Sequence, residues 1–325
     1  MSDSLCRIKW LLWVIFVLLV LSFYPLLASA YDKTVFFPGV NLSGRDFRGQ
    51  NLDGAILTGA NLTGANFEGA SLRNTDLRET YLREANLRSA DLTSAILDGS
   101  DLTRADLRDA NLHSASMIRV VLNAAALNRA NLTNAFLPGS KLIKANLTGA
   151  NLENTILQDA DLTQAVLTNA YLKGSELGSS GLGNSGPHPA TLRGANLSSA
   201  NLSGANLLSV DFSEANLDEV NFDNAQLSYA NLSWVTGRSA SFVGASLAWV
   251  RAYGADFGSA NFSDAEATLA QMTGVNFTEA DLSGANFDYA DLTQAILTRI
   301  VIDTHSSFSK TQFYASTDMP LILEQ

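Results

Sequence analysis

Large apolar side chains recur every five residues along most of this chain. Leu or Phe occupies positions 42, 47, 52, 57 and 62, and the spacing continues to Leu297 and Ile302. The residue two places before each large one is small, most often Ala, and the residue between them is mostly Asn or Asp. From 42 to 302 the large position occurs 53 times, and it departs from Leu, Phe, Met or Ile only at Pro187, Gly237, Ala252 and Ala267. A repeat this regular predicts a solenoid built from one short unit.

A five-residue period fits neither an α-helix nor a flat strand, whose side chains recur every 3.6 and 2.0 residues. A continuous strand would place Leu42 and Phe47 on opposite sides, so the chain must turn by the same angle every five residues to bury both. Four quarter turns close a coil of 20 residues. The position before the large residue supports this number, because some of its apolar occupants are separated by multiples of 20: Ile56, Ile96, Phe136, Ile156 and Ile296.

The pattern A-[DN]-[LF]-[STR]-x resembles the pentapeptide-repeat family over residues 41–302, almost without a break. The resemblance implies an all-β fold, a right-handed quadrilateral β-helix with four pentapeptides per coil. At four repeats per coil the chain would form about 13 coils, and at ~4.8 Å per coil a rod about 60 Å long. Caps are expected to cover the two ends. Residues 31–40 would cap the first coil with Phe36 and Phe37, and residues 303–325 the last, with a short helix from Ser309 or Thr311 that packs Phe313 and Tyr314 against it.

A Gly-, Ser- and Pro-rich stretch interrupts the repeat at residues 178–194. Pro187 and Pro189 have no N–H group for a β-ladder, which predicts an extruded loop at 183–189. The helix would then have a first part at 41–182 and a second part at 190–302. Because Leu182 and Leu192 are both in phase, we expect one helix with a side loop; two stiff segments hinged at the loop are the alternative.

The first thirty residues have the organisation of a secretory signal peptide. Arg7 and Lys9 precede an apolar run from 10 to 21, and Ala28 and Ala30 form a cleavage site that would leave Tyr31 as the first mature residue. The alternative is an uncleaved membrane anchor at 10–27, which is just long enough to span a bilayer. Either segment predicts an exported protein, in the periplasm or thylakoid lumen, or anchored with its repeats outside the cytoplasm.

Composition and motifs argue against an enzyme. The net charge of −11 disfavours binding to nucleic acid or anionic lipid. The single cysteine, Cys6, excludes disulfides and cysteine-ligated metals. His113, His188 and His305 are far apart in sequence and lack metal-ligand spacing. We therefore expect no catalytic residue, no metal and no cofactor.

Two surface features are candidates for recognition. Ile56, Ile96, Ile118, Phe136 and Ile156, together with Pro138, fall on one side of a 20-residue projection. Such a stripe can mark an interface, although its members could also merely pack along the rod. The second feature is a group of arginines that we expect to encircle the rod in salt bridges with Asp and Glu: Arg73, Arg78, Arg83, Arg88 and Arg108.

The sequence favours a non-enzymatic structural or interaction protein that presents a rigid rod to an unidentified protein outside the cytoplasm. Self-association through the apolar face or the end coils is one form of this hypothesis. The resemblance implies an alternative, because some pentapeptide-repeat proteins are acidic rods that bind DNA topoisomerases by imitating DNA. That function would require a cytoplasmic location. An enzyme with its site in the loop or the C-terminal cap is the third hypothesis.

Overall fold

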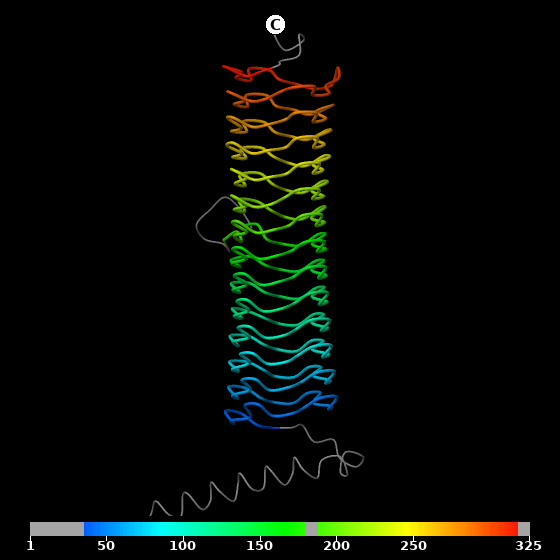
Figure 1. Ribbon diagram of the computed structural model, residues 1–325, viewed down its shortest axis with the longest axis vertical. Helices are drawn as coiled ribbons and strands as arrows, with labels where there is room; N and C mark the ends of the chain where they lie inside the picture. Colours follow the sequence, from blue (N-terminus) through cyan, green and yellow to red (C-terminus); the bar gives the residue numbers. More distant parts are fainter. Residues whose placement is uncertain (1–35, 180–187, 318–325) are drawn as a thin grey trace, which may run out of the picture. The chain divides into compact units, whose positions relative to one another are not determined.

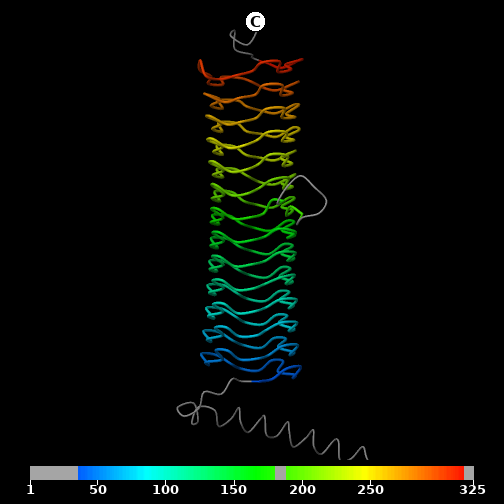
Figure 2. The same cartoon turned by 180° about the vertical axis from the view of Figure 1, so that it is seen from behind.

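The computed structural model describes residues 36–179 and 188–317. The expected signal segment 1–30, with its cleavage site, lies outside these residues, as do residues 183–187 of the expected loop. The described residues form a stack of coils that begins at Phe36 (Figure 1). No residue among them is helical, and every link between coils is a single-residue parallel β-bridge rather than a longer strand. Figure 2 shows the same regular stacking from behind.

The bridges define four faces, one for each repeat of a coil. Face A runs from Phe36 through Ile56 and Ile156 to Ser307, face B from Asn41 to Gln312, face C from Asp46 to Thr317, and face D from Asn51 to Val301. Before the interruption, bridged residues are 20 apart, as in Phe36↔Ile56 and Asn41↔Asn61. The structure therefore confirms the four-sided coil of 20 residues that the sequence predicts.

Each repeat ends in a β-turn that changes the direction of the chain. In the repeat at Leu52, the N–H of Ala55 donates to the carbonyl of Leu52 over 3.0 Å, and Gly54 between them has φ of 67°. A left-handed residue at the third turn position is the sign pattern of a type II turn. The same position is left-handed where it is not glycine, as at Glu79 with φ of 58°. The turn is thus imposed by the coil rather than by glycine alone.

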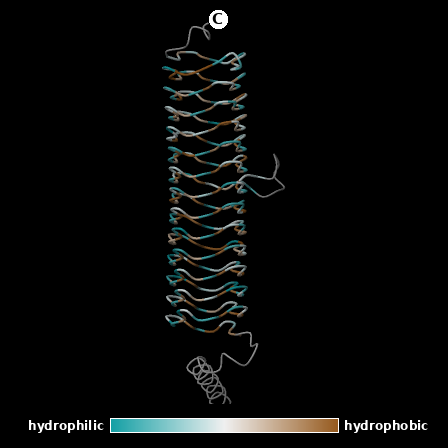
Figure 3. Cartoon of the chain, turned by 90° about the vertical axis from the view of Figure 1, so that its right-hand side faces the viewer, coloured by the Kyte–Doolittle hydropathy of each residue, from teal (hydrophilic) through white to brown (hydrophobic). Residues whose placement is uncertain are grey.

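The interior consists of the large and the small residue of every repeat. Leu62, Leu82 and Ala60 have no more than 1% of their surface exposed, and residues at the equivalent positions are buried along the stack. In the second part phenyl rings fill the core; Phe242 and Phe262 stack with centroids 4.4 Å apart. Hydrophobic and hydrophilic segments alternate along the whole stack (Figure 3). Burial of this continuous core is the main source of stability.

In most repeats an Asn or Asp stands before the large residue, and its side chain caps the turn that follows. The Oδ1 atom of Asn61 accepts a hydrogen bond from the backbone N–H of Thr63 at 3.1 Å, the geometry of an Asx turn. Where this position is not Asn or Asp, an acidic or amide side chain one coil earlier can take its place. Asp98, for example, accepts from the N–H of Ile118 at 2.9 Å. The polar column therefore satisfies backbone groups that would otherwise compete for water.

The interruption inserts ten residues but leaves one continuous stack. Bridges cross it on all four faces with a spacing of 30, as in Asp161↔Thr191 and Glu176↔Asn206. The five-residue phase is kept, while each later repeat moves by two faces. Ile296 consequently lies on face C, where it bridges Asn276, and not on face A with Ile56 and Ile156. The expected alignment of Ile296 with them is wrong, because ten residues are two repeats but only half a coil.

The first residues of the described chain belong to the coil itself. Phe36, in the segment expected as an N-terminal cap at 31–40, bridges Ile56 and is 62% exposed, so it points outward rather than over the first coil. The N–H of Phe37 donates to the carbonyl of Ile56 at 2.7 Å. Residues 36–40 are thus a first repeat, and residues 31–35 lie outside the described part.

The coil also continues beyond 302, where a cap was expected. Ser307, Gln312 and Thr317 bridge residues 21 positions earlier, and Phe308 stacks on Phe287 with centroids 5.5 Å apart. No helix begins at Ser309 or Thr311, and Tyr314 is 79% exposed instead of packed on the last coil. One extra residue in the turn after Ile302 shifts the repeat by one position. The repeats after it therefore do not follow the five-residue spacing of the preceding sequence.

Candidate functional site

The apolar stripe lies on face A, but it is not continuous. Ile56, Ile96, Phe136 and Ile156 all occupy bridged positions of this face, and Phe136 bridges Ile156 directly. Asp76 separates Ile56 from Ile96, and Ser116 separates Ile96 from Phe136. Ile96 and Phe136 are 37% and 39% exposed, and Ile56 and Ile156 are half-buried. These side chains therefore pack partly along the rod and partly face solvent.

The densest part of the stripe surrounds Phe136. Ile118 stands beside it at the following turn position of face A, and the N–H of Arg119 donates to the carbonyl of Pro138 at 2.9 Å. Ile118 is half-buried, and its N–H is bound to Asp98. The structure thus brings Ile118, Phe136, Pro138 and Ile156 together, whereas Ile56 lies beyond the ion pair of Asp76 with Arg78 at 2.6 Å.

The arginines on the early coils are salt-bridged, as the sequence predicts. Arg78 pairs with Asp76 at 2.6 Å, Arg83 with Asp101 at 2.5 Å and Arg108 with Asp106 at 2.5 Å. The hydrogen bond from the Arg78 guanidinium lowers the pKa of the Asp76 carboxyl below its ordinary value; burial opposes this effect, and the Arg78 backbone N–H adds to the lowering. Exposed pairs of this kind contribute little stability individually. They do neutralise the acidic side chains locally.

A Ser, a His and an Asp meet in the turn after Ile302. The ring Nδ1 of His305 lies 3.2 Å from Oδ2 of Asp303, and the Ser306 hydroxyl donates to Asp303 and to the carbonyl of Leu282. A catalytic triad needs the histidine between the nucleophile and the carboxylate. Here Asp303 lies between Ser306 and His305, and it accepts from the N–H of Gly284 at 2.9 Å. These bonds, led by that of Gly284, lower the pKa of Asp303, which caps the turn.

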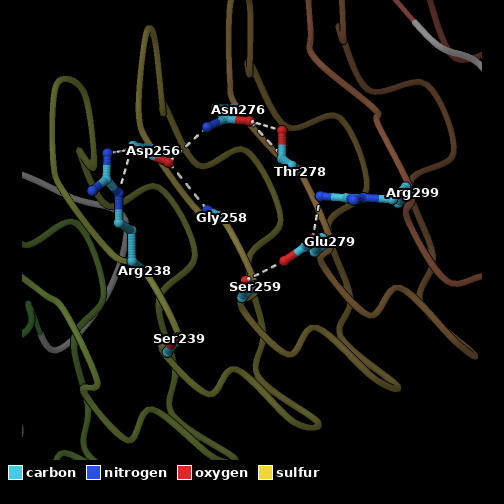
Figure 4. A pocket seen from close by; sticks show the side chains of 9 residues that line it. All are labelled: Arg238, Ser239, Asp256, Gly258, Ser259, Asn276, Thr278, Glu279 and Arg299. Carbon is cyan, nitrogen blue, oxygen red and sulfur yellow. Dashed lines mark hydrogen bonds and ion pairs between the residues drawn. The ribbon is translucent and has the colours of Figure 1, made fainter.

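A polar groove of about 330 Å³ opens on face C near the C-terminal end (Figure 4). Its charged side chains are already paired with one another: Arg238 with Asp256 at 2.6 Å, and Arg299 with Glu279. Asp256 also accepts from the N–H of Gly258 at 3.1 Å and from the Asn276 amide at 2.9 Å. An ionic ligand would have to displace these partners. The groove therefore has no charge free to bind one.

Exposed aromatic side chains gather on the last coils, a feature that the sequence reasoning missed. Trp249 is 43% exposed at the left-handed turn position of face A, and it stacks parallel to Tyr229 with centroids 6.1 Å apart. Leu269 and Tyr289 follow at the same position one and two coils later, and Lys310 lies 5.0 Å over the Tyr289 ring. The sequence contains a signal for these residues, because Tyr229, Trp249, Leu269 and Tyr289 are large side chains spaced 20 residues apart, each two places after the inward position of its repeat.

A second aromatic feature lies on face B and is called the aromatic groove below. It has a volume of about 520 Å³ and is lined by Trp234, Tyr253, Gly254, Thr273, Gly274 and Gln294. Trp234 is 67% exposed. Its ring lies across Gly254, where a Cβ atom would collide with it. The glycine thus allows the indole to lie along the rod.

Two further kinds of site can be assessed over residues 36–179 and 188–317. No group of three or more His, Cys, Asp or Glu side chains in these ranges is placed to hold a metal ion. Helices suited to crossing a membrane are also absent from these ranges. The expected span at 10–27 lies outside them.

Comparison with protein families gives one match along the length of the chain. The model for the family described as Pentapeptide repeats matches it in eight copies, at residues 41–79, 70–109, 85–123, 105–142, 145–180, 206–236, 240–278 and 270–299. These segments together cover more than half of the chain. No curated protein matches it.

Several solved structures are similar to the chain. HetL, a pentapeptide repeat protein involved in heterocyst differentiation regulation from the cyanobacterium Nostoc sp., is 29% identical, with a TM-score of 0.28 over 86% of this chain and 95% of that one. A pentapeptide repeat protein from the thylakoid lumen of Arabidopsis thaliana is 31% identical, with a TM-score of 0.11 over 42% of this chain and 70% of that one. QnrB1, a plasmid-mediated fluoroquinolone resistance protein, is 15% identical, with a TM-score of 0.22 over 84% and 91%. At such TM-scores none of these likenesses supports a statement about partner or activity.

Proposed function

Because this chain belongs to the pentapeptide-repeat family, we propose that its right-handed β-helix is a non-enzymatic scaffold, whose described residues form about 14 coils. The scaffold presents a rigid surface to a protein partner outside the cytoplasm. Members of this family fold as right-handed β-helices and are generally non-enzymatic, which is consistent with the proposal. The partner would contact one face of the rod.

The observation that carries the proposal is the fixed position of outward side chains on a fully hydrogen-bonded frame. Repeats donate to the next coil, as in Leu62 N–H to Tyr81 O at 2.7 Å, and to the previous coil, as in Asn61 N–H to Val40 O at 2.9 Å. Side chains 20 residues apart therefore stand in columns that cannot rearrange without breaking many bonds. A surface held in this way binds a partner with little loss of conformational entropy.

Face A around Phe136 is the surface we propose for a protein partner or for a second copy of the chain. Ile118, Phe136, Pro138 and Ile156 provide an apolar cluster, and Ile96 lies one bridged position beyond Ser116. Aromatic side chains surrounded by apolar neighbours are the usual energetic centres of protein interfaces. Contact through the end coils is the alternative form of self-association.

The proposed location follows from residues 1–30 alone. Arg7, Lys9, the apolar run and the Ala28–Ala30 site support export to the periplasm or thylakoid lumen. If the segment is not cleaved, residues 10–27 would anchor the protein with its repeats outside the cytoplasm. No cofactor, metal or nucleic acid is part of the proposal.

The charge on the surface supports DNA mimicry less well than it supports a scaffold for a protein partner. Double-stranded DNA has one charge per ~1.7 Å of axis, far denser than a net −11 over the whole chain. Many of its acidic groups are also occupied, such as Asp76 by Arg78 and Asp256 by Arg238. A topoisomerase would be met only in the cytoplasm. If the full-length chain is found there, inhibition of gyrase supercoiling becomes the appropriate assay.

Site-specific photo-crosslinking in the native compartment tests the proposed face. We would replace Phe136 with benzoylphenylalanine and, as the matched control, replace Val166, a half-buried apolar residue at the equivalent position of face C. The expected result is a defined crosslinked product from position 136 and none from position 166. Absence of product at 136, or equal products at both, would contradict the assignment of face A.

A further inference from the structure

We propose that the aromatic groove on face B binds an uncharged proline-rich peptide in the polyproline II conformation. The inference deepens the proposed function, on which it rests, by giving the rod a second surface and the chemical class of the peptide that this surface recognises. The aromatic groove is formed by residues remote from the Phe136 cluster, so the proposals for these two surfaces can be tested independently.

The shape of the groove suits an extended, apolar ligand. The Trp234 ring lies across Gly254, and no atom lies within 4 Å of the position that a Cβ of Gly274 would occupy. Tyr253 borders the groove and is 37% exposed. A groove of about 520 Å³ between aromatic rings and bare glycine backbone is the type of surface on which proline-rich segments dock.

The groove is uncharged although the chain as a whole has a net charge of −11. None of its six lining residues carries a formal charge. A charged ligand would lose hydration there without gaining a counter-charge, and this loss would weaken its binding. Proline rings add apolar surface and no charge, so a proline-rich segment matches the groove electrostatically.

The hydrogen-bonding groups of the groove are matched to backbone carbonyls. The hydroxyl of Tyr253 already donates to Gln271, and that of Thr273 donates to Asp291 at 3.1 Å. Within the described residues, the indole N–H of Trp234 and the side-chain amide of Gln294 have no hydrogen-bond partner. Two free donors suit a polyproline II segment, whose carbonyls lack internal partners. A neutral glycan, which needs many partners for its hydroxyls, would be less well satisfied.

The repeat of the rod is commensurate with that of the peptide. A polyproline II helix has three residues per turn and rises ~3.1 Å per residue, so one turn is ~9.3 Å. Two coils of the rod, at ~4.8 Å each, measure ~9.6 Å. Trp234, Gly254, Gly274 and Gln294 occupy the same turn position in four successive coils. A peptide lying along the rod could therefore repeat its contacts every second coil.

Fluorescence anisotropy with a labelled decaproline peptide tests the proposal on the purified full chain. We expect saturable binding of decaproline and none of a Gly-Ser peptide of equal length. Trp234→Ala should weaken binding about tenfold or more, since the indole supplies both the ring and a donor. Trp249→Ala is the matched control, because Trp249 is an exposed tryptophan at the same turn position but does not line the groove.

Three results would overturn the proposal: no binding of decaproline at millimolar concentration, equal losses in the two tryptophan variants, or Trp234-dependent binding of cellohexaose in place of decaproline. Circular dichroism would establish that both variants keep the β-helix. A failure here would leave crosslinking through Phe136 unaffected, and a failure there would leave this binding unaffected, so the two proposals are distinguishable.

Discussion

At the scale of single residues, the small position of most repeats is filled by Ala, Val, Ser or Thr. Most repeats use Ala, which adds no polar atom to the core. Where Ser or Thr stands there, the hydroxyl can donate to the carbonyl three residues earlier, as Thr80 does to Leu77 at 2.7 Å and Ser100 to Leu97 at 2.6 Å. The Thr75 hydroxyl instead donates to the carbonyl of Leu52 in the preceding coil, at 3.1 Å. The Oγ of Ser140 is also buried but, within the described residues, has no partner.

Replacing Ser140 with Ala should therefore stabilise the protein or leave it unchanged. The variant removes a buried hydroxyl that makes no bond, which costs free energy in the native state. Ser100→Ala, in the same column two coils earlier, should lower the free energy of unfolding by about 1 kcal/mol, because it deletes a bond. Urea denaturation of both variants compares them. A larger loss at Ser140 than at Ser100 would contradict this account.

Gly237 stands where most repeats have a large apolar residue, and its small size makes room for the ring of Phe257 in the next coil. A Cβ on Gly237 would lie 2.8 Å from the Phe257 ring, so the ring fills the space that a larger residue would need. We expect Gly237→Leu to destabilise the protein by about 1–3 kcal/mol through overpacking. Adding Phe257→Leu should recover part of that loss. Thermal unfolding of the two single variants and the double variant measures the coupling, and simple additivity would count against it.

Much of this residue-level order was predictable. The period of five and the burial of Leu62 and Leu82 follow from the pattern alone. The stacking of Gly237 with Phe257 follows from the 20-residue coil, but the close approach of the Phe257 ring to Gly237 does not. The aromatic groove was predictable only in part: the sequence places Trp234 and Tyr253 at outward turn positions, but not the direction in which the Trp234 ring lies.

At the scale of the repeat, the number of inserted residues determines whether later repeats change face or lose the five-residue phase. Ten extra residues before Thr191 keep the five-residue phase and move later repeats by two faces, so Ile296 lies on face C and not on face A. One extra residue near Asp303 breaks the phase, so the repeats ending at Thr317 do not follow the five-residue spacing and resemble a cap in the sequence. Sequence periodicity detects a repeat, but the face it occupies depends on every insertion that precedes it.

Deleting residues 180–189 should leave the stack folded. Ser179 would then be followed by Ala190, which restores a regular repeat, and Asp159 N–H could bond to the carbonyl of Gly178 instead of that of His188. We expect the far-UV circular dichroism spectrum to be unchanged and the melting temperature to shift by no more than a few degrees. Loss of cooperative unfolding would mean that the inserted segment is needed to join the coils.

The turn at Asp46 should show a pH dependence of known sign. Hydrogen bonds from the Arg48 guanidinium and the Arg48 N–H hold the pKa of Asp46 at about 2, below its ordinary 3.8. Because the folded pKa is the lower one, the pair contributes fully above pH 3.8, and the contribution is lost as pH falls from there toward about 2.

NMR titration of the Asp46 carboxyl checks this value. Arg48→Gln should return its pKa toward 3.8, whereas Arg45→Gln, which removes a cation that does not hydrogen-bond to Asp46, should change it little. An unchanged pKa in the Arg48 variant would contradict the assigned cause.

At the scale of the whole molecule, many acidic side chains hydrogen-bond to the backbone or pair with arginines, so the acidic composition does not produce a uniformly acidic surface. Asp46 and Asp106 cap turns and pair with arginines, and Asp98 binds the backbone of the next coil. The exposed surface then differs from face to face, with an apolar cluster on face A, paired charges on face C and an uncharged aromatic groove on face B. The two proposed surfaces, on faces A and B, therefore differ in the chemistry that they offer to a partner.

The central claim, an exported binding scaffold, is tested most directly by identifying the mature N-terminus and the compartment together. Cells would be fractionated, and the protein from each fraction would be analysed by intact mass and N-terminal sequencing. The account predicts the protein outside the cytoplasm, beginning at Tyr31, or at full length in the membrane fraction if residues 10–27 anchor it. Full-length protein in the soluble cytoplasmic fraction would contradict the account and would make the topoisomerase alternative the leading hypothesis.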